Sequence, residues 1–279
     1  MGSFRALTLA GVLAAGVIHT ASAADLLPPP PVLDAPLRGS VSDASGWYLR
    51  GDVGVGPAGK ISAQQVFAPK FVVPNLRMVS ENLGDQTLVG VGVGYKFNNW
   101  FRADVTGEYR TGASWSAHSK YDCGGGSCPD VYTAKINEYV FMANGYADLG
   151  TWYGLTPYIG AGVGTAVHGF KGLVDIDPQN GGYGYAKDKY SWALAWSLMA
   201  GVAYDVTANT KLTIGYRYSD MGTATSGHIV CQNTPFCGFE QHKVRVTSHD
   251  LRLGMRWMLG EASPAIIPTL SMMWRCLVI

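Results

Sequence analysis

Ser248 and His249 are the residues whose types come closest to a catalytic pair. A serine nucleophile needs a histidine or another base within hydrogen-bonding distance. These two residues are adjacent in a stretch that alternates polar and apolar side chains, as a β-strand does. Adjacent side chains of a strand point to opposite faces, so the hydroxyl and the imidazole cannot meet. We therefore predict that the protein is not an enzyme.

The histidines are also candidate ligands for a metal ion or haem, because a neutral imidazole commonly binds both. They fall in or near expected loops, at His118, His168, His228, His242 and His249. No two of them have ligand spacing on one strand. We therefore expect solvated loop histidines, no metal site and no cofactor.

Four cysteines form two closely spaced pairs, Cys123 with Cys128 and Cys231 with Cys237. Each pair lies inside an expected long surface loop. In an exported protein this spacing favours local disulfides, and closing so short a ring contributes only about 2 kcal/mol. A four-thiolate metal site is the alternative, which the loose spacing and an oxidising compartment disfavour. Cys276 is left over near the C-terminus.

Charged residues recur at alternate positions along several stretches, on what we expect to be one enclosed face. The cations are Arg50, Lys96, Arg102, Arg110, Lys211, Arg217, Arg252 and Arg256, and the anions are Asp52, Asp104, Glu108, Asp148, Asp205 and Asp250. Enclosed charges must pair, because an unpaired one costs several kcal/mol. An ion-paired network that fills the interior is the favoured interpretation, and a narrow ion path is the alternative.

The stretch 86–111 indicates which element carries these charges. In its first half Val89, Val91 and Val93 alternate with glycines, and in its second half Val105 and Tyr109 alternate with charged residues. A period of two is a strand signal, and the glycines argue against a helix. The apolar faces end in aromatic residues, as lipid-facing strands do at the membrane interface.

The same alternation predicts eight strands. They cover 46–56, 86–97, 101–111, 138–149, a strand beginning at Pro157, 189–206, 211–219 and 246–259. Short and long connections alternate along the chain. This is the pattern of an eight-stranded antiparallel up-and-down transmembrane β-barrel with short periplasmic turns and long extracellular loops. The main rival is a buried helix at 191–204, which is too short to span a bilayer.

The first short connection determines which side chains face lipid. A two-residue turn would pair Phe97 with Trp100 and would place the charges of the following strand in the bilayer. We therefore predict a three-residue turn over 98–100, which lets Phe97 and Phe101 both face lipid. An Asn of this turn is expected to adopt the left-handed conformation.

The two ends of the chain differ from the barrel region. Residues 1–23 have the features of a secretory signal peptide, with Arg5, an apolar run and a cleavage box that predicts cleavage between Ala23 and Ala24. Residues 24–45 form a Pro-rich segment that we expect in the periplasm. The barrel is predicted over 46–259. Residues 260–279 depart from the pattern as an atypical C-terminal tail.

The overall composition is compatible with a membrane barrel and argues against nucleic-acid binding. Charged residues make up 15%, and the net charge is +1, without a basic block. A mean hydropathy of +0.07 suits a barrel, because lipid-facing and interior residues average out. The expected partners are outer-membrane lipid, lipopolysaccharide and the barrel-assembly machinery, with an unknown surface ligand as a further candidate.

Three segments carry a family resemblance, at 94–110, at 144–150 together with 156–164, and at 215–222. They resemble the small OmpA-like eight-stranded outer-membrane β-barrel proteins of alphaproteobacteria over about 46–259. The resemblance implies a bacterial outer-membrane protein with a structural or surface role, and some members of this family are reported to bind haem. We expect a structural, surface-exposed barrel. The alternatives are a small porin, or a protein that binds haem or a host ligand through its long loops.

Overall fold

The computed structural model describes residues 45–57, 62–66, 75–232 and 240–259. The predicted signal peptide with Ala23 and Ala24, nearly all of the Pro-rich segment, and the C-terminal tail with Cys276 lie outside the described residues. The elements within the described ranges are all β-strands. None of these residues forms a helix long and apolar enough to cross a membrane.

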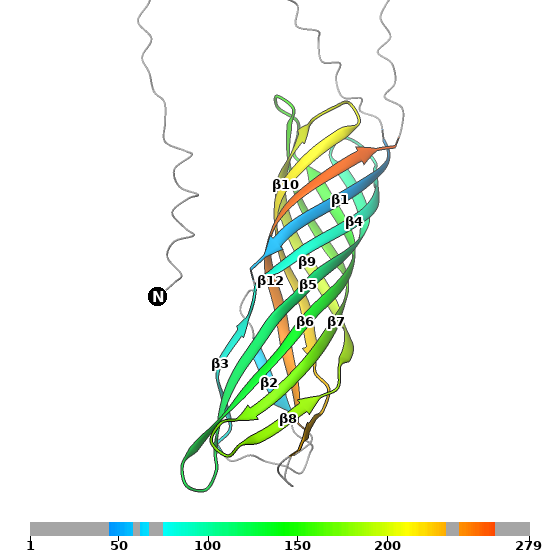
Figure 1. Ribbon diagram of the computed structural model, residues 1–279. Helices are drawn as coiled ribbons and strands as arrows, with labels where there is room; N and C mark the ends of the chain where they lie inside the picture. Colours follow the sequence, from blue (N-terminus) through cyan, green and yellow to red (C-terminus); the bar gives the residue numbers. More distant parts are fainter. Residues whose placement is uncertain (1–44, 58–61, 67–74, 233–239, 260–279) are drawn as a thin grey trace, which may run out of the picture. The chain divides into compact units, whose positions relative to one another are not determined.

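Eight strands close into a ring, because each pairs antiparallel with the next and the last pairs with the first (Figure 1). Around the ring they are β1 (Gly46–Gly56), β4 (Gln86–Lys96), β5 (Phe101–Asp122), β6 (Ser127–Asp148), β7 (Leu155–Asp177), β9 (Lys189–Asp205), β10 (Thr210–Thr225) and β12 (Gln241–Met258). The predicted up-and-down β-barrel is confirmed. The rival helix at 191–204 is wrong, since this stretch lies in β9.

The two ends of the ring differ. At one end, called the turn end here, short connections join β4 to β5, β6 to β7, and β9 to β10. The opposite end, called the loop end, carries four further strands. There β2 (Ser62–Val66) pairs with β12, β3 (Arg77–Leu83) with β5, β8 (Gly182–Ala186) with β7, and β11 (Ile229–Cys231) with β8.

Several strands run much further towards the loop end than the sequence pattern predicts. The predicted strand 101–111 continues to Asp122, and the one predicted to start at 138 starts at Ser127. On β5 the cause is a β-bulge, where the pairing with β6 shifts between Arg110 and Ala113. Arg110 and Ala113 are both buried, so the inward positions change from even to odd numbers. A bulge of this kind interrupts the period of two and hides the strand from a search for alternation.

The outward face of the ring forms an apolar belt between two aromatic girdles. At the turn end the exposed aromatic residues are Trp47, Phe97, Trp100, Trp152 and Trp257, and towards the loop end they are Tyr109, Tyr139, Trp192 and Tyr216. Aliphatic residues such as Val91, Val105, Ile159, Leu194 and Leu253 are exposed between them. A membrane strand needs about 9–11 residues, and β5 has 22. About half of β5 therefore extends beyond the lipid at the loop end.

The first hairpin has the predicted three-residue turn. Lys96 pairs with Arg102, and the Phe97 amide donates to the Phe101 carbonyl at 3.0 Å. The predicted left-handed Asn is wrong, since Asn75 and Tyr153 are the non-glycine residues with positive φ in the described ranges. Instead, Asn98 Oδ1 accepts hydrogen bonds from the amides of Trp100 at 3.0 Å and Phe101 at 2.8 Å.

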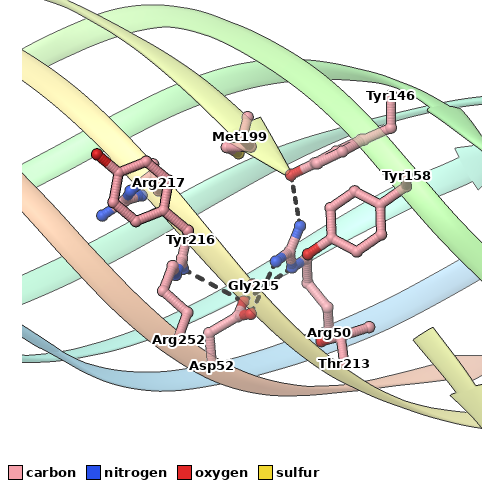
Figure 2. A pocket seen from close by; sticks show the side chains of 10 residues that line it. All are labelled: Arg50, Asp52, Tyr146, Tyr158, Met199, Thr213, Gly215, Tyr216, Arg217 and Arg252. Carbon is pink, nitrogen blue, oxygen red and sulfur yellow. Dashed lines mark hydrogen bonds and ion pairs between the residues drawn. The ribbon is translucent and has the colours of Figure 1, made fainter. Parts of the chain in front are cut away.

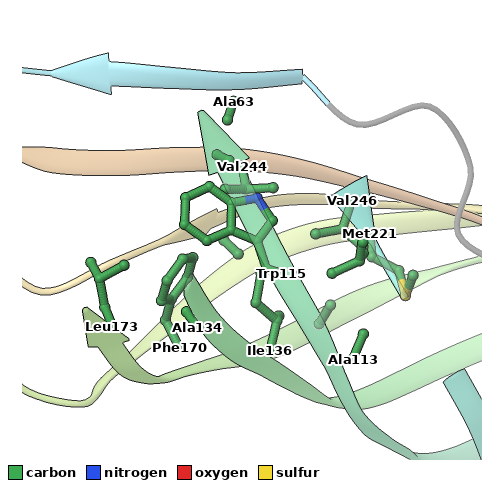
Figure 3. Packing of buried hydrophobic residues seen from close by; sticks show 14 of the residues in the cluster. Ala63, Ala113, Trp115, Ala134, Ile136, Phe170, Leu173, Met221, Val244 and Val246 are labelled. Carbon is green, nitrogen blue, oxygen red and sulfur yellow. The ribbon is translucent and has the colours of Figure 1, made fainter. Parts of the chain in front are cut away.

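The interior has two zones. Near the turn end it is filled with charged and aromatic polar side chains, which are described below. Near the loop end it contains an apolar core around Trp115, Ile136 and Phe170, which Figure 3 shows together with Val244 and Met221. Trp115 is 1% exposed, and its ring centroid lies 5.4 Å from that of Phe170. This core explains why the strands remain ordered beyond the lipid.

Candidate functional site

A charged network crosses the middle of the barrel interior. Arg217 on β10 donates through Nη2 to Glu108 Oε1 on β5 at 2.6 Å and to Asp250 Oδ2 on β12 at 2.7 Å. Arg110 Nε donates to the same Glu108 oxygen at 2.9 Å, and Arg110 also hydrogen-bonds Asp250. All four side chains are at least nine-tenths buried. The network thus joins three strands through the lumen.

Ser248 belongs to this network and not to a catalytic pair. Its Oγ accepts a hydrogen bond from Arg110 at 3.0 Å and donates to Asp250 at 2.5 Å. His249 points to the outer surface, where its Nδ1 lies 2.6 Å from the hydroxyl of Tyr216. The two side chains lie on opposite faces of β12, as the alternation of the sequence requires.

A second charged cluster lies closer to the turn end, around Arg50 (Figure 2). Arg50 donates to Asp52 at 2.8 and 2.7 Å, to Asp104 at 2.8 Å and to the hydroxyl of Tyr146 at 2.6 Å. Arg252 connects the two clusters, because its Nη2 lies 3.5 Å from Asp52 and 3.2 Å from Glu108.

The turn end of the interior is rich in cations. Arg102 donates to Asp148 at 3.1 Å and lies over the ring of Tyr146 at 3.8 Å. Lys96 pairs with Arg102 across β4 and β5 and therefore shares its face. Lys211 pairs with Asp205, and Arg256 lies 5.5 Å from the ring centroid of Tyr48.

Two cavities of about 10 Å³ each lie in the charged zone. One is lined by Arg50, Asp52, Tyr146, Tyr158, Met199, Thr213, Gly215, Tyr216, Arg217 and Arg252 (Figure 2). The other lies beside Arg102 and Arg256. Each has room for about one water molecule. An eight-stranded barrel is just wide enough to be filled by its own side chains, and the ion pairs described above link its strands across the interior.

Two of the histidines lie inside the barrel, which corrects the expectation of solvated loop histidines. His168 and His242 are fully buried at the loop end. His168 Nδ1 lies 3.1 Å from Glu138 Oε1, and its Nε2 donates to the Met221 carbonyl at 2.8 Å. His242 Nε2 lies 3.0 Å from Glu240. The alternation could have found both, because the inward residues of β7 and β12 keep even numbers through His168 and His242. The predicted strand at 246–259 began too late to include His242.

Carboxylates gather at the loop-end opening of the interior, above the apolar core. Burial and the nearby charge of Glu240 raise the pKa of Asp130 to about 7. Burial and the charges of Glu240 and Asp130 raise the pKa of Asp175 to about 8. The hydroxyl of Tyr132 donates to Asp130 at 3.3 Å. In the described ranges, no group of three His, Cys, Asp or Glu residues is arranged to bind a metal.

The predicted disulfide between Cys123 and Cys128 is present and closes the connection from β5 to β6. Cys231 ends β11 and is also disulfide-bonded, whereas its predicted partner Cys237 lies outside the described residues. Cys123, Cys128 and Cys231 thus lie at the loop end, away from the charged network.

Comparisons with known proteins agree on one kind of protein. A family model described as "Outer membrane protein beta-barrel domain" matches residues 10–256. An uncharacterised protein of Brucella abortus is 35% identical over 223 residues, which cover 72% of this chain and 76% of the relative. A Rickettsia typhi protein named "Putative adhesin" is 24% identical over 223 residues, 76% of this chain and 87% of the relative.

Solved structures of small outer-membrane barrels are also similar. The match to OprG from Pseudomonas aeruginosa has a TM-score of 0.49 and 15% identity, and covers 77% of this chain and 97% of OprG. The match to Neisserial surface protein A has a TM-score of 0.44 and 17% identity, and covers 77% of this chain and 99% of that protein.

Proposed function

Because this chain belongs to the outer membrane protein β-barrel family, and is located in the bacterial outer membrane, we propose that it is a structural, surface-exposed barrel of the cell envelope. In this proposal the barrel stabilises the membrane, its interior is closed, and it performs no catalysis. The turn end faces the periplasm, and the loop end faces the outside. The observation that carries the proposal is the network that joins Glu108 to Arg217 across the lumen at 2.6 Å.

The outer surface of the barrel supports the proposed lipid partners. The apolar belt between the girdles suits contact with acyl chains. Just beyond the loop-end girdle, Lys135 and Lys171 lie directly opposite each other on β6 and β7. Like charges at such positions repel, and the phosphate groups of lipopolysaccharide would relieve that repulsion. Insertion by the barrel-assembly machinery belongs to the same proposal.

Single-channel recording in planar bilayers tests whether the interior is closed. We expect no open steps from the purified wild-type barrel. A double variant, Glu108→Ser with Arg217→Ser, should produce steps, because it removes both partners from the middle of the lumen. Asp220→Ser with Arg245→Ser is the matched control, since it removes an ion pair in which the Arg245 side chain is 63% exposed. Regular steps from the wild type would favour the small porin instead.

The structural role itself is tested in cells. Deletion of the gene should increase sensitivity to detergents and to large antibiotics that an intact outer membrane excludes. The wild-type gene should restore resistance, and the Glu108→Ser, Arg217→Ser variant should restore less of it at equal surface abundance. A deletion strain with unchanged sensitivity would contradict the proposal.

A second candidate function is adhesion, favoured by an exposed apolar patch at the loop end. Ile176 pairs with Tyr183 between β7 and β8, and Tyr185 pairs with Val230 between β8 and β11. These four outward side chains are 38–52% exposed and lie beyond the lipid belt. Contiguous apolar surface of this kind commonly marks a binding site, and the similar Rickettsia typhi protein is named "Putative adhesin".

Binding of bacteria to host cells tests adhesion. Tyr183→Ser with Tyr185→Ser should reduce binding, whereas Tyr153→Ser at the periplasmic turn end should leave it unchanged at equal surface abundance. Equal binding by the wild type and both variants would exclude this patch as the adhesive surface. Haem binding through the long loops is the remaining alternative and is tested by a spectral titration with haem. The absence of a saturable Soret shift would contradict haem binding.

A further inference from the structure

Arg256 on β12 is a buried cation that forms no ion pair within the described part of the chain. It is 6% exposed, and its Nε and Nη1 atoms have no hydrogen-bond partner. Its contact in this zone is the ring of Tyr48, 5.5 Å from the guanidinium carbon. A buried donor without an acceptor destabilises the folded state, and a buried charge without a counter-charge does so more strongly.

The two strands that pair with β12 carry further cations next to Arg256. In the sheet register Arg256 lies directly opposite Arg50 of β1 and Lys211 of β10. Like charges at directly opposed positions repel each other. Three adjacent strands therefore place cations at one level of the lumen.

The carboxylates of this level are already engaged by other cations. Asp52 and Asp104 accept hydrogen bonds from Arg50. Asp148 is an attractive charge near Arg256, but its ion pair is with Arg102. Asp205 pairs with Lys211.

A cavity lies beside the unpaired donors of Arg256. It measures about 10 Å³ and is lined by Arg50, Arg102, Tyr158, Thr213, Met255 and Arg256. Three of these six residues are arginines. A space of this size holds one water-sized particle, so it admits a halide ion and excludes sulfate, phosphate and carboxylate ligands.

We propose that one chloride ion occupies this cavity and accepts hydrogen bonds from Nε and Nη1 of Arg256. A water molecule would accept the same hydrogen bonds but would bring no negative charge to a site surrounded by arginines. Chloride supplies both the acceptor and the missing counter-charge. The barrel then has a built-in anion site at the periplasmic end of its interior, which would act as a structural part of the closed lumen.

Bromide in place of chloride tests the location of the ion. Crystals of the wild-type barrel grown in sodium bromide should show an anomalous difference peak within hydrogen-bonding distance of Arg256 Nε and Nη1. Crystals of Arg256→Met should lack this peak and keep any halide peaks on the outer surface. A water molecule without anomalous signal at Arg256 would overturn the proposal.

Unfolding in solution tests whether the ion belongs to the folded protein. At constant ionic strength, replacement of isethionate by chloride should raise the urea midpoint of the wild type in a saturable way, because isethionate is too large for the cavity. The rise should be absent in Arg256→Met and retained in Arg245→Met, which removes an exposed arginine from the same strand. If the urea midpoint of the wild type does not depend on chloride, any bromide peak shows binding at crystal concentration only. This outcome would overturn the proposal.

Discussion

Arg217 on β10 and Glu108 on β5 face each other across the full width of the barrel. Around the ring, four steps separate β5 from β10 through β6, β7 and β9, and four through β4, β1 and β12. The two residues thus come from opposite walls, and the 2.6 Å contact between Arg217 Nη2 and Glu108 Oε1 ties those walls together. Neither side chain is more than 5% exposed.

Removal of one partner of this contact should destabilise the barrel strongly. Arg217→Met leaves Glu108 and Asp250 without one of their cations, and loss of one member of a buried pair costs about 3–5 kcal/mol. Urea unfolding in lipid vesicles measures the loss. The double variant Glu108→Leu with Arg217→Met should lose less than the sum of the single variants. Arg245→Met serves as a control and should cost about 1 kcal/mol or less; an equal loss in this control would contradict the prediction.

The apolar core at the loop end should depend on Trp115. Trp115→Ala removes a side chain that packs on Phe170 and His242, and such a truncation costs about 3–5 kcal/mol. Because Trp115 lies beyond the bulge, amide exchange should accelerate in the loop-end halves of β5 and β6. The membrane half of β5, from Phe101 to Arg110, should keep its protection. Uniform acceleration along β5 would show that the two zones unfold together.

The turn between β4 and β5 should depend on Asn98. Asn98→Ala removes the acceptor of two amide hydrogen bonds, each of which contributes about 0.5–1.5 kcal/mol. The free energy of unfolding, measured by urea titration, should therefore fall by about 1–3 kcal/mol. Asn98→Asp keeps an acceptor oxygen and should lose less. Asn99→Ala, at the neighbouring turn position, is the matched control; equal losses at both positions would contradict the role of Asn98.

The loop end should become less stable as the pH rises. The pKa of Asp175 is about 8 in the folded protein and about 4 in an unfolded chain, so the folded state binds the proton more tightly. The resulting stability is fully present below about pH 4 and is lost progressively as the pH rises to about 8. Asp130, with a folded pKa of about 7, acts in the same direction.

Asp175→Asn removes the ionisation and tests this dependence. Urea midpoints at pH 5.5 and pH 8.5 should differ less in this variant than in the wild type. Asp188→Asn, in the exposed connection before β9, is the control and should leave the wild-type difference intact. A wild-type midpoint that rises between the two pH values would contradict the sign of the effect.

The sequence alone was sufficient to predict the strands of the membrane half of the barrel and the face on which their residues lie. Strand β1 has the predicted bounds. The three-residue turn after Phe97 follows from the alternation, because a turn one residue shorter would have placed the charged side chains of β5 in the lipid. These features are local, since each strand residue there faces either lipid or the lumen and its type reveals which. The same alternation predicted that Ser248 and His249 lie on opposite faces.

Only the tertiary structure decided how the loop end is built and which charges meet. The bulge between Arg110 and Ala113 changes the inward positions of β5 from even to odd numbers, so the loop-end half of β5 has no continuous alternation with its membrane half. On β7 and β12 the alternation continues through His168 and His242, but only the closed ring brings their side chains into a buried interior. The contact between Glu108 and Arg217 depends on ring closure, which sets β5 opposite β10. Alternation specifies the face on which a charge lies, whereas its partner, or the lack of one at Arg256, depends on the strands that the closed ring brings together.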